Sequence, residues 1–73
     1  MKMTDSTAKA VSDLMLSIGT QLNESIRLVQ TTESEEVFRD YRLRVARLMG
    51  FMQDGVMNPL WEEHPHLRPP ELR

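Results

Sequence analysis

The residue types with the most chemical potential lie together near the C-terminus, in the run Glu62-Glu63-His64-Pro65-His66. Carboxylates and imidazoles are both ligands for zinc, nickel and iron. A preset site on a helix would need two histidines four residues apart on one face, whereas Pro65 separates these two in an extended link. We therefore expect no bound metal or other cofactor, and a metal-responsive protein using His64 and His66 is the weakest of three functional hypotheses.

Serines and carboxylates are present, but their spacing does not predict catalysis. A nucleophile has to lie beside a base, and nothing in the sequence places a serine near His64 or His66. Glu62 and Glu63 are neighbours, so on a helix their side chains would point about 100° apart and form no acid–base pair. The chain has no cysteine, which excludes disulfides and cysteine-ligated zinc. We expect no enzymatic activity.

Four arginines form a local basic run, namely Arg39, Arg42, Arg44 and Arg47. On a helix they do not share one narrow face, which is typical of solvated borders whose aliphatic stems cover a core. The net charge of −2 also argues against bulk electrostatic binding of nucleic acid. A small nucleic-acid-associated regulator, in which a dimer gathers these arginines on one surface, is the alternative to the function preferred below.

These groups have to be positioned by two amphipathic segments, about residues 6–30 and 33–57, on either side of the polar turn Thr31-Thr32-Glu33-Ser34. Apolar residues recur in both at steps of three and four, which predicts helices with one apolar stripe each. The first stripe is Val11, Leu14, Met15, Ile18, Leu22, Ile26 and Val29, and the second is Phe38, Tyr41, Val45, Leu48, Met49, Met52 and Val56. Because the turn is short, the two helices should be antiparallel neighbours.

The boundaries of the elements follow from capping chemistry. Thr32 and Glu35 have the spacing of a capping box at the start of the second helix, with Ser34 as a rival N-cap. Asn58 suits an N-cap and Pro59 a first helical position, which predicts a short helical turn over residues 59–63.

Residues 64–73 hold three of the four prolines and are expected to form an extended, polyproline-like arm. The whole chain, residues 1–73, is expected to be a single domain.

A lone hairpin of this size has more apolar surface than it can cover. Chains below about 70–80 residues rarely obtain enough stability from one core, and each stripe is too wide for a single partner helix. The simplest closed arrangement is a homodimeric four-helix bundle. Two alternatives stay open: the Trp61 segment folds back and caps the hairpin, leaving a monomer, or the apolar face receives a different protein.

The sequence therefore predicts an all-α protein whose function is protein–protein interaction or assembly. The residues expected to form its core and interaction surface are Leu14, Ile18, Leu22, Ile26, Tyr41, Val45, Leu48, Met52, Leu60 and Trp61. The N-terminal residues lack an apolar signal core and no run of residues is long enough to span a membrane, so we expect a cytoplasmic protein.

Overall fold

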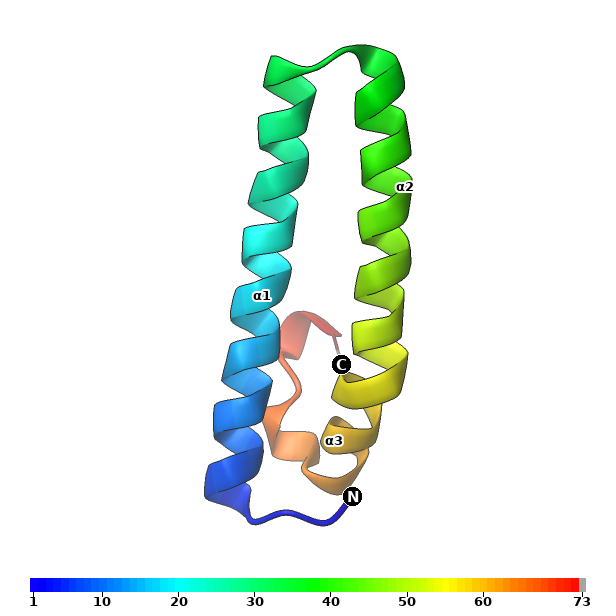
Figure 1. Ribbon diagram of the computed structural model, residues 1–73. Coiled ribbons are helices and arrows are strands. Elements are labelled where there is room, and N and C mark those ends of the chain that lie inside the picture. Colours follow the sequence, from blue (N-terminus) through cyan, green and yellow to red (C-terminus); the bar gives the residue numbers. More distant parts are fainter. Residues whose placement is uncertain (73) are drawn as a thin grey trace.

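The computed structural model describes residues 1–72 and is helical throughout most of that range. The elements are α1 (Asp5–Thr32), α2 (Glu35–Met52), the π-helical turn η1 (Gln53–Met57), α3 (Asn58–Glu63) and the 3₁₀ turns η2 (Pro65–Leu67) and η3 (Pro70–Leu72). The long helices α1 and α2 run antiparallel and side by side (Figure 1). The predicted all-α helical hairpin is confirmed.

The register between α1 and α2 is marked by two contacts. The hydroxyl oxygens of Ser25 and Tyr41 are 2.7 Å apart and share a hydrogen bond. Further along, Gly19 faces the side chain of Met49. In an antiparallel pair this register places Ile18 level with Leu48, as the sequence pattern predicts.

The start of α2 differs from the predicted capping box. Ser34 is the N-cap, and its side chain accepts a hydrogen bond of 3.2 Å from the backbone N–H of Val37. Thr32 belongs instead to the last turn of α1, where its hydroxyl donates to the carbonyl of Leu28 at 2.8 Å. The capping box of Thr32 and Glu35 is therefore wrong, because α1 continues two residues beyond its expected end.

No break separates α2 from α3. Asn58 has helical backbone angles, φ −62° and ψ −48°, and its N–H bonds to the carbonyl of Gln53, so it is not the expected N-cap. Pro59 explains the wide turn before it. In α-helical geometry a proline ring clashes with the carbonyl four residues earlier, here that of Gly55. A π-helical turn relieves this clash while the chain stays helical.

The tightest packing lies at the open end of the hairpin, where α3 meets α1. Leu60 and Trp61 are 0% and 1% exposed, and they are the largest fully buried side chains of the described chain. The indole N–H of Trp61 donates to the hydroxyl of Ser12 at 3.0 Å, across 49 positions of sequence. Ala8 of α1 is also fully buried. The Trp61 segment therefore folds back onto the hairpin.

The C-terminal segment is not the continuous extended arm that the prolines predict. Backbone hydrogen bonds from Leu67 to His64 (3.0 Å) and from Arg68 to Pro65 (3.2 Å) close the turn η2. Arg68, at φ −66° and ψ 127°, is extended after it, and the turn η3 begins at Pro70. The guanidinium of Arg68 lies 5.7 Å from the ring centroid of Trp61, so this segment covers the indole from outside.

The predicted core is only partly right for the single chain. Val45, Leu60 and Trp61 are buried as expected. Five further predicted residues are only half-buried, namely Ile18, Leu22, Ile26, Tyr41 and Met52. Leu14 and Leu48 are 54% and 48% exposed, so the single chain does not bury them. The reason is that α2 and α3 cover only part of the stripe of α1, and both leucines lie on the uncovered side.

Replacing Ser12 by Ala should destabilise the fold, since the buried indole N–H of Trp61 would lose its acceptor. We expect a loss of about 1–3 kcal/mol in the free energy of unfolding, measured by urea denaturation. Ser17→Ala is the matched control, because Ser17 only accepts an exposed hydrogen bond from Gln21. Equal effects of the two substitutions would contradict the proposed role of the Trp61–Ser12 hydrogen bond.

Candidate functional site

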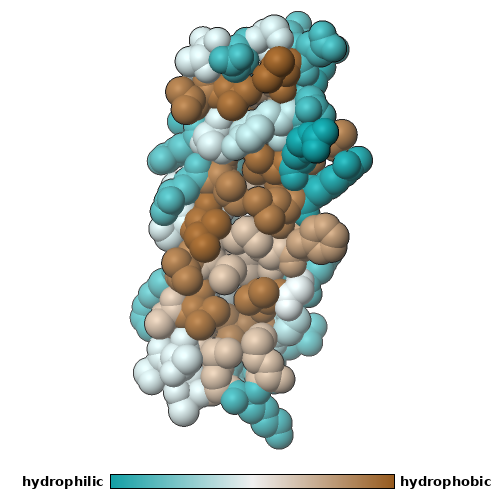
Figure 2. All heavy atoms as spheres, in the orientation of Figure 1, coloured by the Kyte–Doolittle hydropathy of each residue, from teal (hydrophilic) through white to brown (hydrophobic). Residues whose placement is uncertain are grey.

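One face of the hairpin carries exposed apolar side chains that the C-terminal segment does not cover. In Figure 1 this segment lies behind the long helices, and Figure 2 shows brown, apolar atoms along the seam between α1 and α2 on the near side. At about 100° per residue, and with the register given by Ser25 and Tyr41, the large apolar side chains on this side of the seam are Leu14, Ile18, Leu48 and Phe51, with Arg44 between the last two. We call the four apolar residues the front face.

Three of the front-face residues are exposed to a degree that is unusual for large apolar side chains gathered together. Phe51 is 79% exposed, Leu14 54% and Leu48 48%, whereas Ile18 is half-buried. Scattered exposed leucines are common on soluble proteins, but a contiguous group on one face marks a surface that binds something.

The charged residues of α1 lie away from the front face. The charged residues of this helix are Asp5, Lys9, Asp13, Glu24 and Arg27. At about 100° per residue they all fall within an arc of about 100°, on the edge turned away from the front face. The edge of α1 next to the front face therefore has uncharged residues along its whole length, among them Ala10, Ser17 and Leu28. Depletion of charge is the compositional signal of an interface core.

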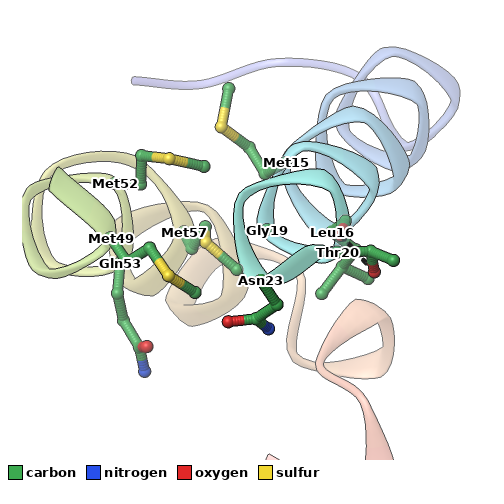
Figure 3. Close-up of a pocket in the computed structure, with 9 residues that line it drawn as sticks. All are labelled: Met15, Leu16, Gly19, Thr20, Asn23, Met49, Met52, Gln53 and Met57. Atoms are coloured by element: carbon green, nitrogen blue, oxygen red, sulfur yellow. Dashed lines mark hydrogen bonds between the residues drawn. The ribbon is translucent and has the colours of Figure 1, made fainter. Parts of the chain in front are cut away.

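A methionine-rich pocket of about 330 Å³ lies on the opposite side of the seam (Figure 3). Its lining residues are Met15, Leu16, Gly19, Thr20, Asn23, Met49, Met52, Gln53 and Met57. The side chains of Met15, Met49 and Met52 lie in the space between α1 and α2. Methionine adapts its shape to irregular gaps, so this pocket is typical of an incompletely filled core above α3.

The four arginines of α2 form no common basic surface within the chain. Arg39 pairs with Glu35 at 2.8 Å and Arg44 with Asp40 at 3.1 Å, one helical turn away in each case. The guanidinium of Arg42 lies over the ring of Phe38, 5.6 Å from its centroid. These local partners are typical of a solvated helix surface, and nothing in this geometry favours the nucleic-acid hypothesis.

The two histidines lie beside a residue from the other end of the chain. Nδ1 of His64 is 2.5 Å from Oδ1 of Asp5, and Nε2 of His66 is 3.8 Å from the same oxygen. Asp5 is in the first turn of α1, whereas His64 follows α3 and His66 lies in η2. His64 is 9% exposed, and its ring lies edge-on to that of His66.

The sequence did not connect Asp5 with the histidines, because 59 positions separate it from His64. No local spacing could have indicated this contact. It arises because α3 folds back beside the start of α1.

Within residues 1–72, none of the helices is both long and apolar enough to form a membrane-spanning segment. Comparison of the chain with protein families, with curated proteins and with solved structures gives no match. The functional argument therefore depends on the geometry above.

Gly19 and Gly50 are sites where the structure has room for a side chain. A Cβ at Gly19 would meet only the terminal carbon of Met49, at 4.0 Å, and one at Gly50 would meet nothing within 4 Å. Close helix approach therefore does not require glycine. We expect Gly19→Ala and Gly50→Ala each to stabilise the fold by about 0.5–1 kcal/mol, through helix propensity, in urea denaturation. A loss of stability at Gly19 would mean that the helices pack more closely than described here.

Proposed function

We propose that this protein is a small protein-interaction or assembly factor that acts as a homodimer, with no catalytic activity. The observation that supports the proposal best is the front face. Leu14, Leu48 and Phe51 are all about half exposed or more and lie on one side of the seam. They adjoin an edge of α1 that carries no charge.

A second copy of the chain is the occupant that suits this face. The front face covers about one turn of each long helix, in the half of the hairpin nearer its open end. Two copies related by a twofold axis could pack these turns against each other and align their helices in a four-helix bundle. Docking of this kind would cover apolar surface that α3 and the C-terminal segment leave open. A chain of 73 residues has few other means of increasing its stability.

The charges nearest the front face are compatible with such docking. At about 100° per residue, Arg44 falls between Leu48 and Phe51, and it pairs with Asp40 at 3.1 Å. Arg47 also lies beside Phe51, because the two residues line one shallow hollow. Bringing two copies together would therefore place the compensated Asp40–Arg44 pair at the contact, and Arg47 would need to keep its charge in water at the border. An unpaired buried charge would be the main cost of association.

Substituting a front-face residue by Glu should dissociate the dimer without unfolding the chain. Phe51 is 79% exposed, so Phe51→Glu leaves the packing within one chain almost unchanged. In the dimer the carboxylate would be buried, and we expect the dissociation constant to rise at least tenfold, comparable to the loss of a hot-spot side chain worth about 2 kcal/mol. Sedimentation equilibrium over a range of concentrations measures this change.

Leu43→Glu is the matched control. Leu43 is 52% exposed, like Leu14, but lies on the outer side of α2, away from the front face. This variant should keep the dissociation constant and the helicity of the original chain. A wild-type chain that stays monomeric at every concentration would exclude the homodimer, and equal weakening by both substitutions would exclude the front face as its contact.

A further inference from the structure

Asp5, His64 and His66 bring three metal-ligating side chains to one point. One ligand atom from each can be chosen so that all three lie within 4.8 Å of one another. The two shorter separations are 2.5 Å from Asp5 Oδ1 to His64 Nδ1 and 3.8 Å from Asp5 Oδ1 to His66 Nε2. This cluster has a different composition from the front face and lies at the open end of the hairpin, so it is not explained by dimerisation.

These distances can be compared with those around a metal ion. With bonds of about 2.0–2.2 Å to nitrogen and oxygen, two ligands of a tetrahedral zinc ion lie about 3.2–3.6 Å apart. One observed separation is somewhat shorter than this range and another somewhat longer. The third separation, between the two histidine nitrogens, is at most 4.8 Å and is also longer. Shifts of about 1 Å at the side-chain ends would therefore bring the three atoms into coordinating positions.

The local structure allows these shifts without disturbing the fold. His64 is the anchored member, because its backbone N–H bonds to Leu60 and its carbonyl accepts from Leu67, at 2.9 and 3.0 Å. The side chains of Asp5 and His66 are 72% and 58% exposed, so they can adjust. Water can reach the same place and complete the coordination sphere.

The donor set selects the class of ion. Two imidazole nitrogens and one carboxylate oxygen suit zinc and the neighbouring divalent transition metals, whereas calcium and magnesium prefer oxygen ligands alone. Glu63 is next in sequence to His64, but its carboxylate faces the N-terminal ammonium group at 3.5 Å and is not one of the three ligands.

We propose that Asp5, His64 and His66 bind one divalent transition-metal ion, with zinc the best fit, and that this ion fastens the start of α1 to the segment after α3. The ion takes the place of the hydrogen bond between Nδ1 of His64 and the carboxylate of Asp5, and a proton carried by Nδ1 moves to Nε2 or is released to water. The neutral ring then carries its proton on Nε2. Because the ligands lie far apart in sequence, binding closes a long loop and stabilises the folded chain.

Titration of the full-length, untagged protein with Co²⁺ tests this site directly. We expect visible absorption bands that saturate at one Co²⁺ per chain and disappear when Zn²⁺ is added in competition. Zn²⁺ should also raise the midpoint of thermal unfolding, since it binds the folded chain preferentially. An unchanged midpoint together with no Co²⁺ absorption would overturn the proposal.

Three variants separate this site from binding elsewhere on the surface. His66→Gln and Asp5→Asn remove one ligand each from exposed positions, and both should weaken Co²⁺ binding at least tenfold while the far-ultraviolet circular dichroism stays the same. Asp13→Asn is the matched control, because Asp13 is an exposed acid of α1 whose partner is Lys9. It should bind Co²⁺ like the original chain. Undiminished binding by His66→Gln or by Asp5→Asn would overturn the assignment.

Discussion

The burial of Trp61 against α1 is the interaction on which the rest of this structure depends. Two antiparallel helices alone share a single narrow contact, and along most of its length the side chains are only half-buried. At the open end, Trp61 and Leu60 provide the enclosed apolar volume that the hairpin otherwise lacks. The hydrogen bond to Ser12 satisfies the indole N–H, so the large ring is buried without leaving a polar group unpaired.

This arrangement gives the molecule two unlike ends. The open end is closed by α3, the C-terminal segment and the contact of Asp5 with His64, whereas the end with the turn has only α1 and α2. Local stability should follow the same gradient, because buried apolar contacts decide how easily a segment opens. The front face lies between the two ends, and its leucines and Phe51 are left exposed by the single chain.

Much of the fold could be predicted from the sequence, because short-range sequence patterns determine where its helices and turn lie. Steps of three and four residues indicated both long helices, and the short polar turn indicated their antiparallel arrangement. The apolar stripes of the two helices could not reveal that Leu14 and Leu48 are exposed. A helical repeat gives the direction in which a side chain points, but not what packs against it. That depended on where α3 docks, a contact between residues far apart in the chain.

The candidate sites were predictable to unequal degrees. The sequence indicated an interaction surface and named Leu14 and Leu48 in it, although Phe51 was left off the stripe because its angle lies beside the core. The two histidines were recognised as metal-ligand types, but the spacing of His64, Pro65 and His66 argues against a site by itself. Asp5 supplies a third ligand type beside the two histidines, and this proximity arises only in the tertiary structure.

The π-helical turn between α2 and α3 sets the rotational phase of everything after it. A wide turn holds one more residue than an α-helical turn, and each residue rotates the helix by about 100°. Loss of a single residue from Gln53–Met57 would swing Trp61 away from Ser12 and carry His64 away from Asp5 at the same time. The burial of the indole and the position of the histidine cluster therefore both depend on the length of this five-residue turn.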